Sequence, residues 1–237
     1  MAVDVKLVKD DGSKPVDQTT YQSIVGSLLY AATSTRPDIS HAVGVLSKFC
    51  SAPTETHLTA AKRVLRYLKG TSEYGIRYTR TDKQPIAYSD ASWAETEGRH
   101  STSGVVFMHC DGPISWLSKQ QSVVALSTAE AEYIAAYEAT KEAAWLRQLY
   151  QGIENAPTSP IVLHIDNQSA INIANKSETS KRCKHMDIKF HYVRQEIANN
   201  HIITKHCYTE SMVADILTKS LSRDRFVKLR DMLGVVS

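Results

Sequence analysis

Four carboxylates stand where strand ends or a buried helix face would deliver them, and together they could hold a divalent cation. Asp90 ends the run PIAYSD, Asp166 ends the run PIVLHID, Glu132 lies in LSTAEAEYIAA and Asp215 lies in MVADILTK. Carboxylate oxygens are preferred ligands of Mg²⁺. Two such ions about 4 Å apart can activate a water and stabilise the leaving oxygen of a phosphodiester. Because four clustered acids would be unfavourable without metal, the set predicts a metal-dependent, nuclease-type site.

Each aspartate also has a structural alternative. Carboxylates at strand ends are common turn residues, which would account for Asp90. Asp166 precedes an expected helix and could serve as its N-cap. Asp215 is different, because it falls inside an apolar helical pattern where aspartate is a poor residue. The first two alternatives stay open, whereas the third position favours a functional role.

Two glutamates compete for the chemical role in the segment STAEAEYIAA. Ser127 and Glu130 fit the S-x-x-E capping box at a helix start, which gives Glu130 a sufficient structural task. Glu132 instead shares a helix face with small and apolar residues expected to pack on a sheet. A glutamate on that face must be paired or metal-bound, because burying a bare charge is costly. We therefore prefer Glu132. The face consists of Ala135, Ala136, Ala139, Ala143 and Leu146.

The elements that must position these acids fall into two parts, divided by the polar stretch YTRTDKQP at residues 78–85. Before it, TTYQSIVGSLLYAATS, ISHAVGVLSKFCS and HLTAAKRVLRYLKG show helical spacing of apolar residues. Pro37 and Asp38 open the second of these, since proline is tolerated in a first turn. The first part is predicted to be mainly helical.

The second part alternates strands and helices. PIAYSD, STSGVVFMHCDG and PISWLSKQQ predict three strands, with a hairpin at Cys110–Pro113. A long helix is expected from Ala129 to about Tyr150, then strand PIVLHID, a short helix from Gln168, a second helix, strand HIITKHCYT, and the helices SMVADILTKSL and SRDRFVKLRDMLG. Hairpin-joined strands followed by crossovers predict an α/β fold with a mixed five-stranded sheet and flanking helices.

Composition excludes several other classes. The chain has 237 residues, 42% of them hydrophobic and 22% charged, so it can bury a core. Its apolar runs are far shorter than the ~20 residues of a membrane span, and its charged N-terminus lacks the pattern of a signal peptide. Four widely spaced cysteines without a CxxC exclude a disulfide scaffold and a ribbon-type zinc site. The net charge of +3 does not by itself imply nucleic acid.

Two groups of basic residues are candidate nucleic-acid contacts. Lys62, Arg66 and Lys69 form a ridge on one face of the third helix, which is either a solvated face or a surface for a phosphate backbone. Residues 176–194 hold six basic residues against two acids, and beside a nucleic-acid cleft they favour substrate contact. The candidates in that segment are Lys181, Arg182, Lys184 and Lys189. Cysteines and histidines nearby match no standard zinc spacing.

These motifs resemble a known family. YSDASWAETEGRHSTSGVVF, ISWLSKQQSVVALSTAEAEYIAA, HIDNQSAINIA, CKHMDIKFHYVRQEI and ADILTKSL resemble the ribonuclease H domain of copia-type LTR retrotransposon Pol polyproteins. The earlier stretch YQSIVGSLLYAATSTRPDISHAVGVLSKFCSAPTETHLTAAKRVLRYLKG resembles the segment that follows the palm of the reverse transcriptase. The resemblance covers roughly residues 20–222 and implies a reverse-transcriptase-like helical segment at 1–80 and a ribonuclease H-like domain at 81–222. The pattern of the tail predicts a C-terminal amphipathic helix at 223–237.

The resemblance also implies roles for the acids. Asp90 would bridge two Mg²⁺ ions, with Mn²⁺ as a substitute. Glu132 and Asp166 would hold the ion on the leaving-group side, and Asp215 the ion that activates water. The implied reaction is hydrolysis of the RNA strand of an RNA–DNA hybrid. The implied partners are that hybrid and the remainder of a Pol, with no membrane. The implied setting is the cytoplasm, within a virus-like particle for an active element, or the nucleus.

Some features of the family are absent from this chain. The polymerase motif Y-x-D-D is missing, so polymerase activity is not expected. His206 has no Gly-rich loop around it and receives no proton-transfer role. One alternative is a catalytically silent or domesticated nucleic-acid-binding fragment of a Pol. A D-D-E transposase or integrase is disfavoured, because such enzymes carry their glutamate late, where this chain has Asp215.

Overall fold

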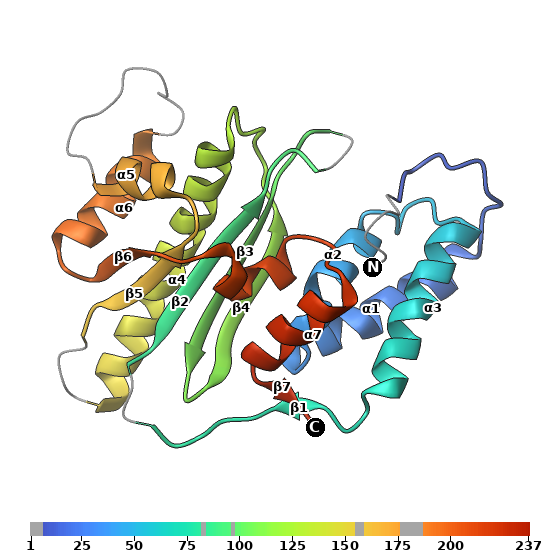
Figure 1. The fold of residues 1–237 in the computed structure, drawn as a ribbon. Helices are drawn as coiled ribbons and strands as arrows, with labels where there is room; N and C mark the ends of the chain where they lie inside the picture. Colours follow the sequence, from blue (N-terminus) through green and yellow to red (C-terminus); the bar gives the residue numbers. More distant parts are fainter. Residues whose placement is uncertain (1–6, 82–83, 96–97, 155–158, 176–186) are drawn as a thin grey trace.

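The protein consists of a five-stranded mixed sheet with helices on both faces and a group of N-terminal helices packed beside it (Figure 1). The computed structural model describes residues 7–81, 84–95, 98–154, 159–175 and 187–237. The order of the sheet is β4-β3-β2-β5-β6. The predicted α/β class is confirmed: a mixed five-stranded sheet with flanking helices follows a mainly helical segment.

The N-terminal part forms the three expected helices, α1 (Gln18–Ser34), α2 (Ser40–Ser47) and α3 (Glu55–Gly70). A short 3₁₀ turn, η1 (Pro37–Ile39), leads into α2. Asp17 caps α1 by accepting a hydrogen bond from the Thr20 N–H at 2.7 Å. The three helices bury their apolar faces against one another in a core of their own. The helical part therefore has a hydrophobic core separate from the two cores of the sheet.

The sheet begins with three antiparallel strands, β2 (Ile86–Ser92), β3 (Thr102–His109) and β4 (Gly112–Gln120). The turn between β3 and β4 holds two residues at positive φ, 55° and 60°, which matches the right-handed twist of a two-residue hairpin. Strands β5 (Ile161–Ile165) and β6 (Ile202–His206) add in parallel on the other side of β2. The predicted hairpin and crossovers are therefore present.

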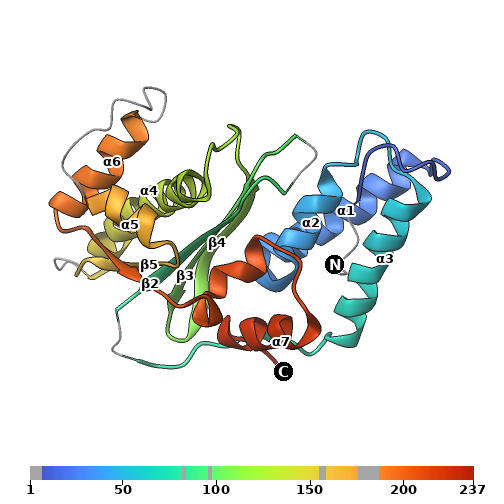
Figure 2. The ribbon, with the colours of Figure 1, turned by 45° about the horizontal axis from the view of Figure 1, so that its top comes forward.

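Alternate residues of β3 face two separate cores. Val105 and Phe107 pack against α4 (Thr128–Glu154) and its neighbour α5 (Gln168–Asn175), with α6 (Asp187–Ala198) beside them. Val106 and Met108 pack on the opposite face, against the C-terminal segment that includes α7 (Arg223–Met232). The period of two along a strand thus supplies both layers of the fold. Figure 2 shows α4, α5 and α6 on one side of the sheet and α7 on the other.

The prediction of a helix over SMVADILTKSL is wrong. The segment forms one short 3₁₀ turn, η4 (Val213–Leu217), and begins at the last residue of another, η3 (Thr209–Ser211), instead of forming a helix. All five residues of η4 are buried, whereas an amphipathic α-helix buries one stripe. Met212, between the two turns, is fully buried with a ψ of 93°, which interrupts any continuous helix.

The C-terminus returns to the junction between the two parts. Strand β7 (Val235–Val236) pairs antiparallel with β1 (Gly75–Ile76), a pairing the sequence did not reveal. A second link joins the sheet to the helices, because the Trp116 indole N–H donates to the Ala32 carbonyl at 2.7 Å. The domain limits at residues 80 and 222 stay predictions. Among the described residues no helix is long and apolar enough to cross a bilayer.

Candidate active site

The parallel pairing of β2 and β5 brings the first and third acids together. Ser89 and Ile165 are the last pair of these two strands, so Asp90 and Asp166 follow it where the parallel pairing ends. Asp90 does not end its strand as predicted, because β2 continues to Ser92 and pairs Asp90 with Gly104 of β3. Parallel strands end at a shared edge, where ligand sites commonly form. The alternative role for Asp166 is excluded, because Asn167 caps α5 by accepting from the Ala170 N–H at 3.0 Å.

Helix α4 delivers the second acid across one face of the sheet. Its predicted stripe of small residues is buried as expected, with every member at most 3% exposed. Alanines at this contact let the helix axis approach the strands closely. Glu132, at 5% exposed, contacts β2, where its Oε1 accepts a hydrogen bond from the Ala91 N–H at 3.1 Å. Burial on the sheet-facing side was the reason for preferring Glu132.

The rejected glutamate performs the structural task assigned to it. The Glu130 N–H donates to the Ser127 hydroxyl at 3.2 Å, and its Oε2 accepts from the Leu126 N–H at 2.8 Å. This closes the N-terminus of α4 much as a capping box does. The two glutamates therefore differ in position on α4. Glu130 caps the N-terminus of the helix, and Glu132 points to the acidic cluster.

Three of the four predicted acids form one cluster. Asp90, Glu132 and Asp166 each offer a carboxylate oxygen, and these oxygens lie within 4.8 Å of one another. Burial raises the pKa of all three carboxyls above their ordinary values. The mutual repulsion of the acids adds to this, since Asp90 and Asp166 raise the pKa of Glu132 further. The cluster is therefore an unfavourable concentration of negative charge that a cation would relieve.

Asp215 lies beside this cluster, already engaged by two cations. It is only 2% exposed. Its Oδ1 lies 2.8 Å from the Lys219 ammonium and its Oδ2 2.5 Å from the Arg225 guanidinium. The Lys219 ammonium also lies 3.4 Å from Oδ2 of Asp90, so it bridges the two acids. The structure thus places the fourth acid next to the first, with a lysine between them.

Thr218, Lys219 and Arg225 are polar residues of the site that the sequence analysis missed. The Thr218 hydroxyl donates to Asp90, and Lys219 supplies the attraction that opposes the rise in the pKa of that carboxyl. The proximity of Lys219 to Asp215, four residues apart in ADILTK, was a signal that could have been used. Arg225 lies beyond the turn after η4, and only the fold shows its contact.

The donor set fits a hard divalent cation. All candidate ligands are carboxylate oxygens, as Mg²⁺ and Mn²⁺ prefer. Oε2 of Glu132 is buried without a hydrogen-bond partner among the described residues, although its other oxygen is held. A buried carboxylate oxygen in that state is costly unless an ion or water completes it. Asp90, Glu132 and Asp166 would form the core of such a site.

The basic candidates are scattered relative to the acids. Lys62, Arg66 and Lys69 are exposed on α3, the N-terminal helix farthest from the sheet in both views (Figures 1 and 2). Lys189 is half-buried on α6, with its ammonium 5.6 Å from the centre of the Tyr137 ring. Lys181, Arg182 and Lys184 lie outside the described residues.

Comparison with curated proteins identifies relatives over almost the whole chain. The Pol polyprotein of transposon TNT 1-94 of Nicotiana tabacum is 40% identical over 218 residues, or 92% of this chain. That of transposon RE1 of Arabidopsis thaliana is 40% identical over 237 residues, or 99% of this chain. The chain belongs to the copia-type retrotransposon Pol family. It spans 16% of the length of each of these two polyproteins.

Other comparisons add less. Secreted RxLR effector protein 161 of Plasmopara viticola is 52% identical over 128 residues, which is 53% of this Pol-related chain and 90% of that protein. No family model matches. A ribonuclease H1 from compost, LC11, is 17% identical with a TM-score of 0.43, covering 61% of this chain and 96% of that one. A foamy viral protease-reverse transcriptase in complex with RNA/DNA hybrid is 13% identical, with a TM-score of 0.49, covering 84% and 26% respectively.

Proposed function

We propose that the chain is a metal-dependent endonuclease that hydrolyses the RNA strand of RNA–DNA hybrids, as the ribonuclease H part of a retrotransposon reverse transcriptase. The observation that carries the proposal is the meeting of Asp90, Glu132 and Asp166, which are 42 and 34 positions apart along the chain, with oxygens within 4.8 Å. The Pol family supports it independently, since the chain matches Pol polyproteins over nearly all its length.

The residues around the acids prepare them for a cation. The Ala91 N–H orients Glu132, and the Thr218 hydroxyl orients Asp90, so both carboxylates are held in advance of binding. When bound, Mg²⁺ or Mn²⁺ ions in such a site activate the attacking water and stabilise the leaving oxygen of the phosphodiester. For Asp215 to join the site as a ligand, Lys219 must turn away, and its side chain is one-third exposed, so solvent lies within its reach.

The proposal includes partners that only a longer protein would supply. The substrate is an RNA–DNA hybrid, contacted by exposed cations such as those of α3. The polymerase part of a Pol would hold that hybrid further along its length. Exposed lysines and arginines bind phosphates in a salt-dependent way, so binding is expected to weaken steeply as salt is raised.

The test replaces one acid without changing its shape. Asp90→Asn should reduce Mg²⁺-dependent cleavage of a labelled hybrid to background while retaining hybrid binding, because the amide keeps the volume and loses the charge. Asp111→Asn is the matched control, since this aspartate lies exposed in the β3–β4 turn. Cleavage by Asp90→Asn at the rate of the unmodified protein would refute the assignment.

A second function is favoured by one observation. Lys219 and Arg225 already neutralise Asp215, which suits a silent nucleic-acid-binding fragment that never recruits metal. The same assay separates the two functions. Salt-sensitive binding of the hybrid without cleavage at any concentration of Mg²⁺ or Mn²⁺ would favour the silent fragment.

A further inference from the structure

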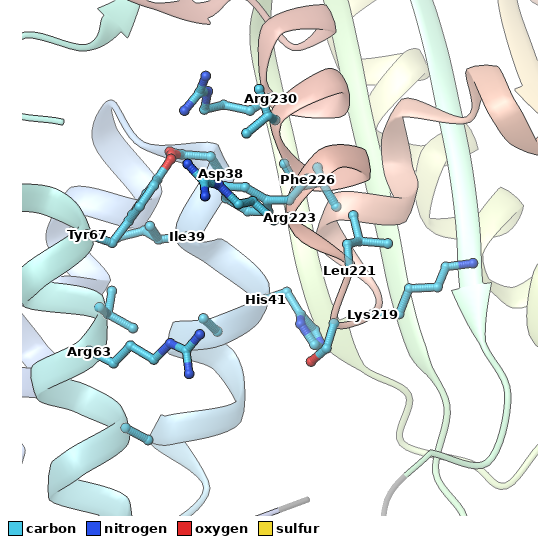
Figure 3. Close-up of a pocket in the computed structure, with 16 residues that line it drawn as sticks. Asp38, Ile39, His41, Arg63, Tyr67, Lys219, Leu221, Arg223, Phe226 and Arg230 are labelled. Atoms are coloured by element: carbon cyan, nitrogen blue, oxygen red, sulfur yellow. The ribbon is translucent and has the colours of Figure 1, made fainter. Parts of the chain in front are cut away.

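A cavity lies between the N-terminal helices and the C-terminal segment. It has a volume of about 530 Å³ and is enclosed by α2 and α3 on one side and by η4, the following turn and α7 on the other (Figure 3). Volumes of 300–1,000 Å³ are typical of sites for small ligands. Lys219 lines this cavity and also contacts Asp90 and Asp215, so the cavity adjoins the carboxylate site.

Two guanidinium groups at the cavity have no hydrogen bond or ion pair with another described residue. Arg63 of α3 and Arg223 of α7 both line it, and both are exposed. Neither has an ion pair or hydrogen bond within the described part of the chain. Asp38 is the acid that lines the cavity within the described ranges, and it is already neutralised by a bidentate pair with Arg36 at 2.8 and 3.0 Å. The cavity therefore presents net positive charge from two elements that face each other.

The rest of the lining includes an apolar surface and a buried histidine. Ile39, Leu221 and Phe226 supply apolar wall. His41 is only 8% exposed, lines the cavity and makes no hydrogen bond or ion pair among the residues described. A buried imidazole without a partner is unfavourable unless something in the cavity completes it. Its burial lowers its pKa to about 4, so at neutral pH the ring offers one donor and one acceptor.

We propose that this cavity binds a nucleotide unit, with the phosphate on Arg63 and Arg223 and the base or sugar against the apolar wall, where His41 supplies a hydrogen bond. Guanidinium groups bind phosphate oxygens strongly and often in bidentate fashion. An apolar wall beside a buried imidazole suits a base, which has an apolar face and a polar edge. For a nucleotide within a strand, the inference rests on the proposed function, because the strand would continue from the carboxylate site past Lys219.

The experiment measures binding to the full chain in EDTA, where no cleavage occurs. The probes are AMP and a labelled single-stranded oligodeoxynucleotide, which distinguish a free nucleotide from a nucleotide in a strand. Arg63→Ala/Arg223→Ala should weaken whichever probe occupies the cavity at least about tenfold. For the oligonucleotide it should also reduce the salt dependence by about one to two phosphate contacts. Ala60→Phe, which fills the cavity without changing charge, should weaken the same probe.

The controls separate the cavity from general electrostatics. Lys14→Ala/Lys228→Ala removes two positive charges at exposed positions outside the cavity lining and should change binding less than about twofold. Thermal melts verify that every variant is folded. Unchanged binding of both probes in Arg63→Ala/Arg223→Ala, or an equal loss in the control, overturns the proposal. Because no metal is present, this result is independent of whether Asp90→Asn abolishes cleavage.

Discussion

The charge on Glu132 illustrates the conflict between stability and chemistry at a single residue. Its carboxylate is buried beside two other acids, with one oxygen unpaired among the described residues. Glu132→Gln should abolish cleavage, yet in EDTA it should stabilise the fold by about 1 kcal/mol, because a neutral amide is less costly to bury. Hybrid-cleavage rates and urea unfolding in EDTA measure the two effects.

Glu130→Gln provides the matched control for that change, two residues away on the same helix. Its contacts are those of a helix terminus, so cleavage should persist while stability falls by about 0.5–1 kcal/mol. If Glu130→Gln abolished cleavage and Glu132→Gln did not, the assignment of the two glutamates would be reversed.

Lys219 occupies the space between two buried acids and compensates them in the absence of metal. Lys219→Met should destabilise the metal-free protein by about 2 kcal/mol, because Asp90 loses the one cation paired with it in the described part of the chain, while Asp215 keeps its pair with Arg225. Mg²⁺ should then restore more stability in the variant than in the unmodified chain, because binding to the native state raises the melting temperature. Melting curves with and without Mg²⁺ provide the measurement. An identical Mg²⁺ shift in both proteins would show that lysine and metal do not compete.

At the residue scale, the sequence predicted the acids better than their surroundings. Asp90 and Asp166 were predictable because strand ends meet at one edge, and Glu132 because a small-residue stripe identified the buried face. Lys219 was missed although its four-residue spacing from Asp215 is visible in the sequence. Arg225 was missed because a cation in a polar tail carries no pattern of its own. Their partners are decided by how η4 and α7 fold over the sheet.

Among the elements, the close approach of η4 to β3 depends on a single glycine. Gly104 pairs with Asp90 across the sheet, and a Cβ there would lie 2.5 Å from the Thr218 methyl and 2.9 Å from the Ala214 carbonyl oxygen. Gly104→Ala should therefore displace η4, destabilise the protein by about 2–3 kcal/mol and reduce cleavage, because Thr218 and Asp215 move with the turn. Unfolding and cleavage assays together test this.

A second glycine offers the opposite expectation. Gly26 lies inside α1, and apart from its chain neighbours and the adjacent helix backbone no atom of the described residues lies within 4 Å of a Cβ placed there. Gly26→Ala should stabilise the chain by about 0.5–1 kcal/mol without changing cleavage, since alanine is the better helix former. If Gly26→Ala destabilised the chain as much as Gly104→Ala, the loss at Gly104 could not be attributed to its contact with η4.

Helix α2 carries a histidine whose protonation opposes folding. Burial, aided by nearby Lys48, lowers the folded pKa of His41 to about 4, against 6.5 in the unfolded chain. The unfolded state thus binds more protons between these values, so stability is full above pH 6.5 and falls as pH decreases towards 4. His41→Leu should remove this part of the loss, up to about 3 kcal/mol at pH 4. The measurement is the difference in unfolding free energy between the two proteins from pH 7 to 4. A difference that is independent of pH would contradict it.

Element types were largely predictable, and the exception has a physical cause. Regular helices and strands repeat an apolar period that the sequence displays. Residues 212–218 around Asp215 are all buried, so their run of consecutive apolar residues cannot distinguish an α-helix from the 3₁₀ turn η4 that it forms. The pairing of β1 with β7 was equally hidden, because two-residue strands are too short to show alternation.

For the whole molecule, contacts across the junction indicate that the helical part and the sheet unfold together. The Phe226 ring of α7 packs edge-on against Tyr67 of α3, with ring centres 5.6 Å apart, while also joining the core beneath the sheet. The Arg230 guanidinium lies 4.5 Å from the centre of the Tyr74 ring. With β1–β7 and the Trp116 hydrogen bond, these contacts join segments from both ends of the chain.

Cooperative unfolding can be tested because the three tryptophans all lie after residue 81, whereas helices are distributed over both parts. Tryptophan fluorescence and far-UV circular dichroism should give one coincident melting transition in the unmodified chain. Phe226→Ala should lower stability by about 2 kcal/mol and separate the two transitions, because it removes a side chain shared by both parts. Ile188→Ala, which truncates a side chain that is 81% exposed, should leave them coincident. Two separate transitions in the unmodified chain would instead show that the helices and the sheet are independent folding units joined by weak contacts.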